Sequence, residues 1–296
     1  MFSIHPRDIK PIPTALPGVT LRVPVVQAPL GCCGSHCLAA SVSRSGGLGT
    51  FSAHNPNVAV WRSQLRRIRA LTAHPVMLAF TAQWETDAIL NDALAAGFRL
   101  FHVFWWNGPR LAPRIQRGGG HVYWQVGTIV EARDAVEMGA SALVAQGTEA
   151  GGQVRSPRPV LDLVRELREA FGVDLPIIAG GGFADGRDTQ DALDAGANAA
   201  FFGTRFLLSE EARAPVQDKA RLLRANTPDL HLDTRVMGDW PCSPRRQLAS
   251  AREREPNPAR YAGLGIGRMT SVLPARTILL SLAPRTDCEN RVRVRK

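Results

Sequence analysis

The sequence that decides the fold is Ala145-Gln146-Gly147-Thr148-Glu149-Ala150-Gly151-Gly152-Gln153, a polar loop after the short apolar run 142–145. Three of the six residues 147–152 are glycine and none is proline, so the backbone is free to approach a flat or anionic ligand closely. Small apolar residues that end in such a loop are typical of a buried parallel strand, which delivers its functional loop at its C-terminal end. We therefore expect this loop at the ligand-binding face of a parallel sheet.

Two further glycine clusters follow downstream, Gly180-Gly181-Gly182 and Gly203-Thr204, and each again ends an apolar run. A single loop of this kind is better explained as a surface connection between a strand and a helix. Glycines at two strand ends are, by themselves, more often ordinary barrel turns than a phosphate site. Their recurrence nonetheless favours an architecture that repeats strand, loop and helix.

The apolar runs divide the first two thirds of the chain into eight strand-then-helix units, spaced by about 25 residues. The expected strands cover residues 23–28, 48–51, 76–80, 99–105, 121–126, 142–145, 176–179 and 199–202. This rhythm predicts an α/β fold, a (β/α)₈ TIM barrel, rather than a doubly wound sheet. The doubly wound alternative requires a G-x-G-x-x-G pattern after the first strand, where this chain has Gly31-Cys32-Cys33-Gly34.

The regular alternation of expected strands and helices ends near Arg213. Residues 214–260 contain six prolines and one helix-like stretch, 216–225, which predicts a small lobe over the active-site face. Residues 261–284 regain an apolar helical pattern, so the barrel is expected to comprise residues 1–213 and 261–284. The basic tail 285–296 is interpreted as solvated or disordered.

Bulk composition excludes several classes of protein. The chain has 296 residues and a net charge of +10, but 33 of its 36 basic residues are arginines scattered over every expected helix. Because no nucleic-acid motif accompanies them, nucleic acid is not expected as a partner. No apolar stretch approaches the roughly 18 residues that span a bilayer. Five cysteines, two of them adjacent, do not form a secreted disulfide framework, so the cytoplasm is the expected compartment.

Several ordered segments resemble one enzyme family. These are residues 25–30 with 45–49, the opening loop, residues 178–187, residues 195–197 with 203–206 and, more weakly, residues 261–267. In these segments the chain resembles the nitronate monooxygenase family, formerly called 2-nitropropane dioxygenases. This is a family of FMN-dependent TIM-barrel enzymes that also includes the flavin-dependent enoyl-ACP reductases. The resemblance implies an FMN cofactor, with the lobe covering it.

The same resemblance implies a set of cofactor-binding positions. The backbone of Ala28, Pro29 and Leu30 is expected against the flavin ring, and Thr81 and Gln125 are expected to make polar contacts with it. Relatives commonly carry asparagine where this chain has Thr81. The phosphate would be held by backbone N–H groups after the seventh and eighth strands. The glycine-rich positions assigned to the cofactor are Gly151, Gly152, Gly181, Gly182, Gly203 and Thr204.

The chain departs from the family at Gln153, where relatives usually carry a histidine that takes a proton from the substrate carbon. A carboxamide donates and accepts hydrogen bonds but does not carry off a proton. The expected activity is oxidation of alkyl nitronates by oxygen through a bound flavin. Two alternatives stay open: NAD(P)H-dependent reduction of enoyl thioesters or quinones, and flavin binding without turnover. A small-molecule substrate is expected, and assembly into a homo-oligomer stays open.

Other polar residues are assigned structural roles. Cys32, Cys33, His36 and Cys37 fit no standard zinc spacing, so no metal is predicted. Mid-strand His102 is interpreted as a core histidine. Glu149, the only carboxylate of the opening loop, is expected to shape that loop by accepting backbone hydrogen bonds.

Overall fold

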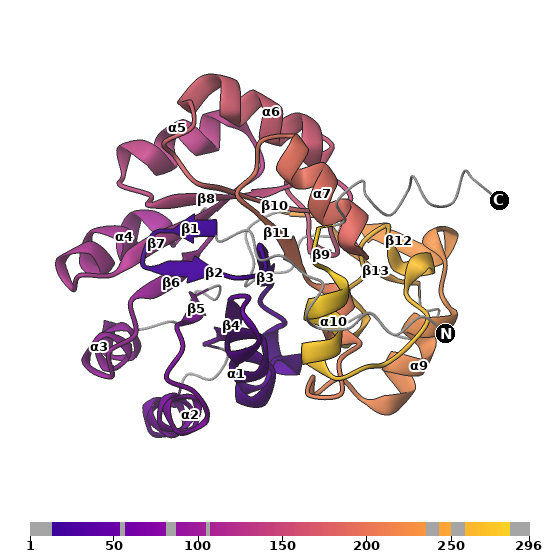
Figure 1. Ribbon diagram of the computed structural model, residues 1–296, viewed down its shortest axis with the longest axis horizontal. Helices are drawn as coiled ribbons and strands as arrows, with labels where there is room; N and C mark the ends of the chain where they lie inside the picture. Colours follow the sequence, from indigo (N-terminus) through magenta and orange to yellow (C-terminus); the bar gives the residue numbers. More distant parts are fainter. Residues whose placement is uncertain are drawn as a thin grey trace.

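The structure is a computed structural model that describes residues 14–53, 57–80, 87–104, 107–234, 243–249 and 258–284. Within these residues, eight parallel strands form one sheet in the order β3-β11-β10-β8-β7-β6-β5-β4. A parallel bridge between Val26 and Leu48 joins the two end strands, with Gln27 N donating to Leu48 O at 2.9 Å. The sheet therefore closes on itself, and the predicted (β/α)₈ barrel is confirmed (Figure 1).

The limits of the barrel strands lie within two residues of the expected ranges, and those of β5, β7 and β11 match them. They are β3 Val25–Gln27, β4 Gly49–Ser52, β5 Val76–Phe80, β6 Leu100–Val103, β7 His121–Val126, β8 Ala142–Gln146, β10 Ile177–Gly180 and β11 Ala199–Phe202. The helices that follow them are α1 His36–Ser45, α2 Val58–Leu71, α3 Asp87–Ala95, α4 Gly108–Arg117, α5 Ile129–Glu137, α6 Val160–Phe171, α7 Gly186–Asp194 and α8 Thr204–Leu207.

Alternation along the strands produces two separate apolar layers. On β6, Phe101 and Val103 point outward into the layer between strands and helices, whereas Leu100 belongs to the layer inside the barrel. Trp61 of α2 packs in the outer layer on Phe51, with ring centroids 6.3 Å apart. Because successive strand residues face opposite sides, the inward face of each strand end must supply the floor of any ligand site.

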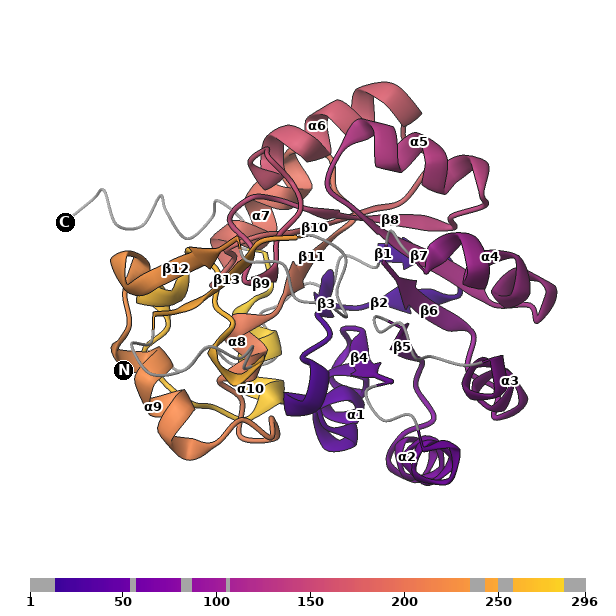
Figure 2. The ribbon, with the colours of Figure 1, turned by 180° about the vertical axis from the view of Figure 1, so that it is seen from behind.

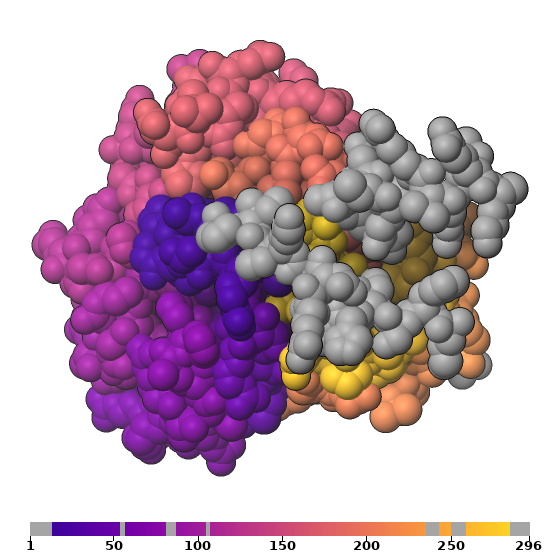
Figure 3. All heavy atoms as spheres, in the orientation of Figure 1, coloured from indigo at the N-terminus to yellow at the C-terminus, as the bar shows by residue number. Residues whose placement is uncertain are grey.

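An N-terminal hairpin, β1 Thr14–Leu16 and β2 Val19–Leu21, was not predicted from the sequence. Its Leu16 and Leu21 belong to the inner layer of the barrel, and Tyr123 Oη donates to Pro17 O at 2.7 Å. The hairpin lies in front of the barrel strands in Figure 1, and its indigo atoms cover part of the barrel end in Figure 3. It packs at the end where β7 begins, so the C-terminal ends of the strands remain for the ligand.

The remaining elements stand beside the barrel. They are α9 Val216–Arg224, η2 Thr227–Asp229, β12 Leu230–Asp233, β13 Arg245–Leu248, η3 Pro258–Arg260, η4 Ile266–Arg268 and α10 Ala275–Ser281, together with β9 Gly152–Gln153 and η1 Gly31–Cys33 of the barrel loops. Strands β12, β13 and β9 form a three-stranded sheet (Figure 2). Since β9 belongs to the loop after β8, this sheet joins the extra elements to that loop. The expected limits at residues 213 and 261 stay a prediction.

Candidate functional site

The loops after β10 and β11 offer unused backbone donors. Gly181, Gly182 and Gly203 are half-buried, and none of the hydrogen bonds among the described residues is donated by their N–H groups or by that of Thr204. Gly203 lies beside Ala28, since a Cβ added to Gly203 would stand 3.7 Å from Ala28 Cβ. Helix α8 has only four residues, so an anion bound here would be held by these peptide groups, which we call the cradle, and not by the N-terminus of a long helix.

The segment expected against the flavin ring is held by a buried side chain. Gln27 Nε2 donates to Ala28 O at 2.5 Å, and Gln27 Oε1 accepts from Thr50 N at 2.9 Å. Ala28 N donates to Phe202 O at 2.9 Å, which attaches the segment to β11. Ala28 and its two successors, Pro29 and Leu30, are only half-buried and therefore present a surface at the barrel mouth.

Of the two polar positions expected at the ring, only Gln125 can be placed. It lies on β7 with 3% of its surface exposed. Thr81 lies outside the described residues.

Three loops meet a C-terminal segment that we call the strap, residues 261–268. A Cβ on Gly151 would stand 2.5 Å from the carbonyl carbon of Ala262, and one on Gly265 would stand 2.1 Å from Gly182 O. Gly182 itself has φ of +66°, a conformation that favours glycine. Leu264 N donates to Glu149 O at 2.9 Å. These glycines are therefore needed because backbone packs directly on backbone.

Thr204 and Gly152 extend this contact zone. Thr204 Oγ1 accepts from Gly263 N at 3.1 Å, so the hydroxyl binds the strap. Gly152 has φ of +72°, and an added Cβ would stand 3.1 Å from the Tyr261 ring. The structure thus gives Gly151 and Gly152 packing contacts and the Thr204 hydroxyl a hydrogen bond to the strap, whereas the N–H groups of the two later loops donate to no other described residue.

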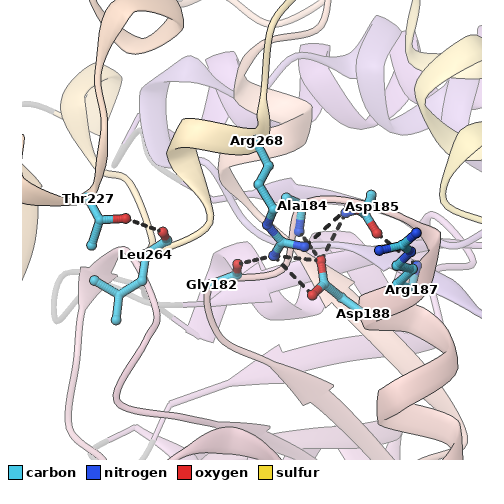
Figure 4. A network of polar contacts seen from close by, with 8 residues as sticks. All are labelled: Gly182, Ala184, Asp185, Arg187, Asp188, Thr227, Leu264 and Arg268. Atoms are coloured by element: carbon cyan, nitrogen blue, oxygen red, sulfur yellow. Dashed lines mark hydrogen bonds and ion pairs between the residues drawn. The ribbon is translucent and has the colours of Figure 1, made fainter.

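Arg268 of the strap holds the loop after β10 (Figure 4). Its Nη2 donates to Gly182 O at 3.3 Å and lies 2.9 Å from Asp188 Oδ2, and its Nη1 donates to Asp185 Oδ2 at 3.2 Å. Asp185 caps α7, because its Oδ1 accepts from Arg187 N at 2.8 Å. Sequence reasoning missed Arg268, since no local pattern marks a contact 86 residues away.

The opening loop is clamped from two sides. The Glu149 carboxylate accepts from Val160 N at 3.0 Å, where Pro159 offers no side-chain cap for α6. Arg246 Nη1 donates to Ala150 O at 2.7 Å and also to Thr148 O. Burial raises the pKa of Glu149 above its ordinary value, although the backbone N–H groups and Arg246 oppose this. Glu149 therefore shapes the loop, as expected, through the first turn of α6.

Gln153 presents a hydrogen-bond donor. Its Oε1 accepts from Ser243 Oγ at 2.7 Å, and its backbone O accepts from Gln146 Nε2 at 2.7 Å. It pairs with Arg245 across the β9–β13 ladder. Since the carboxamide oxygen is engaged by Ser243, Nε2 is the group left for a ligand; it makes no hydrogen bond within the described part of the chain.

His102 lies inside the barrel. Its neighbours Phe101 and Val103 point outward, and its ring contacts Phe104 and Phe201 at centroid distances of 5.2 and 5.7 Å. It is fully buried, and burial lowers its pKa to about 3, an effect that nearby Gln125 partly opposes. Neither ring nitrogen has a hydrogen bond of regular geometry within the described residues. His102 is thus a neutral core histidine.

The first loop places two adjacent cysteine thiols, Cys32 and Cys33, in different environments. Among the described residues, no group of three or more His, Cys, Asp or Glu side chains is arranged to hold a metal ion. Cys32 is exposed, and a hydrogen bond with the Cys33 thiol lowers its pKa to about 6, although burial opposes this. Cys33 is buried, and the same hydrogen bond, with burial, raises its pKa.

At pH 7, iodoacetamide is expected to modify Cys32 much faster than Cys33, because the thiolate is the nucleophile and Cys32 forms it near pH 6. Peptide mass spectrometry over a time course measures both rates. The rapid modification should disappear in Cys32→Ser and persist in Cys37→Ser. Rapid labelling that survives in Cys32→Ser would contradict the prediction.

Comparison with known proteins identifies the family. A model of the nitronate monooxygenase family matches residues 107–264, just over half of the chain. The chain belongs to that family. A carboxyl-CoA dehydrogenase of Mycobacterium tuberculosis, (3aS,4S,5R,7aS)-5-hydroxy-7a-methyl-1-oxo-octahydro-1H-indene-4-carboxyl-CoA dehydrogenase, is 30% identical over 74% of this chain. A nitronate monooxygenase of Neurospora crassa is 27% identical over 70% of it. The match spans 62% of the dehydrogenase and 66% of the monooxygenase.

Solved structures agree with this assignment. FabK from Thermotoga maritima superposes with a TM-score of 0.79 at 22% identity, covering 88% of this chain and 92% of FabK. A nitroalkane oxidase from Streptomyces ansochromogenes gives a TM-score of 0.76 at 26% identity, covering 88% of this chain and 95% of the oxidase. The nitronate monooxygenase family and FabK are flavin-dependent enzymes, and FabK superposes on the barrel of this chain. Over the described residues, no helix has both the length and the apolar character needed to cross a membrane.

Proposed function

We propose that this protein is an FMN-dependent oxidoreductase that oxidises anionic alkyl nitronates with oxygen. The observation that carries the proposal is the set of N–H groups of Gly181, Gly182, Gly203 and Thr204 at the C-terminal ends of β10 and β11, none of which donates a hydrogen bond to another described residue. Backbone N–H groups at this face of a barrel are the usual phosphate ligands of the fold. FMN, when bound, would supply the two-electron acceptor that the side chains lack.

The residues around the cradle fit such a cofactor. Gly203 borders Ala28. A single FMN molecule could therefore place its phosphate at Gly203 and its ring over Ala28. Gln27 and β11 hold Ala28 in place. Gln125, at the C-terminal end of β7, contributes a carboxamide that both donates and accepts hydrogen bonds.

Gln153 favours a substrate that has already lost its proton. Its Nε2, which donates to no other described residue, is a donor suited to the oxygens of an anionic nitronate. Neither His36 nor His102 replaces the missing base well. Burial and the neighbouring Arg213 and Arg67 lower the pKa of His36, and a histidine with a pKa of about 3, such as His102, is a weak base at neutral pH.

Titration of the purified protein with FMN tests the proposal, read as flavin fluorescence quenching and as the visible spectrum. Gly203→Ala should fold, because its Cβ meets only Ala28 Cβ at 3.7 Å, and should weaken FMN binding by shielding a free N–H. Gly34→Ala is the matched control, since it also has room but its N–H already donates to Gly31 O at 3.1 Å. A protein that binds no FMN would refute the proposal.

A second candidate activity is reduction or dehydrogenation of a CoA thioester. It is favoured by the name of the Mycobacterium tuberculosis relative, a carboxyl-CoA dehydrogenase. Anaerobic stopped-flow mixing separates the two activities. Rapid flavin reduction by NADH or NADPH, or by an acyl-CoA, favours the thioester enzyme, whereas reduction by a nitronate alone favours the first proposal.

A further inference from the structure

The strap contacts each of the three loops that meet at the cradle. Leu264 N reaches the loop after β8 through Glu149 O, and Gly263 N reaches the loop after β11 through Thr204 Oγ1. Arg268 reaches the loop after β10. Thr227 Oγ1 donates to Leu264 O at 2.8 Å, which fixes the strap from the lobe side (Figure 4). The strap therefore determines how the three loops stand relative to one another.

Arg268 is the only described side chain of the strap with ion pairs to this site. Its guanidinium lies between Gly182 O and the two carboxylates of Asp185 and Asp188, as Figure 4 shows. Asp188 Oδ2 also accepts from Ala184 N at 2.6 Å. The Arg268 side chain thus joins the glycine turn to the start of α7. Because its guanidinium is planar and rigid, the directions of these hydrogen bonds are fixed.

The charges of Arg268, Asp185 and Asp188 matter because these residues lie close to the cradle. The carboxylates of Asp185 and Asp188 follow within seven residues of Gly181 and Gly182, whose N–H groups donate no hydrogen bond within the described residues. Unneutralised, they would repel a phosphate at the cradle. Arg268 lies 2.9 Å from Asp188 and 3.2 Å from Asp185, so it offsets part of this negative field while its bond to Gly182 O orients the turn.

We propose that Arg268 is a positioning residue for phosphate recognition: it orients the Gly181-Gly182 turn and neutralises Asp185 and Asp188, so that the cradle accepts the phosphate of FMN. This inference rests on the proposed function. It predicts that Arg268 acts on the phosphate end of the cofactor and not on the ring. Riboflavin, which has the same ring without the phosphate, separates the two effects.

The experiment compares FMN and riboflavin binding to apoprotein by fluorescence quenching. Arg268→Gln should raise the Kd for FMN roughly tenfold, about 1.4 kcal/mol, and leave the Kd for riboflavin unchanged. Arg187→Gln is the matched control: it removes one positive charge from the same turn of α7, but no hydrogen bond or ion pair of its side chain is among the contacts of the described residues. That variant should bind both flavins as the unmutated protein does.

Further variants keep the proposal falsifiable. Asp185→Asn in the Arg268→Gln background should recover part of the FMN affinity, because asparagine still caps α7 but removes one repelling charge. Should Arg268→Gln not fold, Arg268→Lys keeps the charge and loses the planar fork, and an intermediate FMN Kd is expected. Equal weakening of FMN and riboflavin, or no weakening of FMN, would overturn the inference. An unmutated protein that binds neither flavin would instead refute the proposed function.

Discussion

Replacing Gln153 by histidine is expected to raise the oxidation rate of neutral nitroalkanes by roughly 10² to 10⁴-fold, the usual range for general-base assistance. The gain is expected because imidazole takes a proton near neutral pH and a carboxamide does not. Oxidation of preformed nitronates should change little, since these anions have no such proton to lose. Oxygen uptake with each substrate form, at equal flavin occupancy, measures both rates.

The unmutated protein provides the internal reference for this prediction. It should oxidise nitronates much faster than the corresponding nitroalkanes, with Gln153 Nε2 donating to the bound anion while Ser243 holds Oε1. Ser243→Ala frees that oxygen and should reduce nitronate turnover without creating nitroalkane activity. Equal rates on the two substrate forms in the unmutated protein would eliminate this interpretation of Gln153.

Replacing Asp233 by leucine should destabilise the protein by about 3–5 kcal/mol, the usual cost of leaving a buried charge without its partner. Asp233 and Arg245 pair at 2.9 Å between β12 and β13, and each side chain is only 2% exposed. Nε and Nη1 of Arg245 have no hydrogen bond of regular geometry within the described residues, and Asp233 is the carboxylate that pairs with its charge, with the Tyr261 hydroxyl as a further polar neighbour. Urea-induced unfolding followed by circular dichroism gives the change in the free energy of unfolding.

Two further variants distinguish charge from packing. Asp233→Leu combined with Arg245→Met removes both charges and should recover most of the lost stability, as buried pairs replaced by apolar residues commonly do. Arg165→Gln removes an ion pair of similar length, 2.9 Å to Asp162, whose side chains are 57% and 54% exposed, and should change stability by less than about 1 kcal/mol. A double variant as unstable as Asp233→Leu alone would show that the charge is not the cause.

The barrel could be predicted from the sequence because its signals are local. Strands such as β5 and β7 are short apolar runs whose limits were predicted to the residue, and α2 shows Trp61, Leu65 and Ile68 at helical spacing. The caps at Ser35 and Asp185 are also local, since each side chain bonds a backbone group two or three residues on. The N-terminal hairpin escaped prediction because three-residue strands carry too little alternation to be recognised.

The site depended on the tertiary structure. Gly182 and Gly265 lie far apart in the chain, yet a Cβ on Gly265 would stand 2.1 Å from Gly182 O, and a Cβ on Gly151 would stand 2.5 Å from the carbonyl carbon of Ala262. The same closure places Ser243 on Gln153 across 90 residues and Arg268 on Gly182 across 86. Hydrophobic periodicity and turn residues predict structure only within one strand or one helix turn, and they do not predict contacts between distant segments. Which loops meet at the barrel mouth, and which donor each one leaves free, is decided when the sheet closes and the strap crosses it.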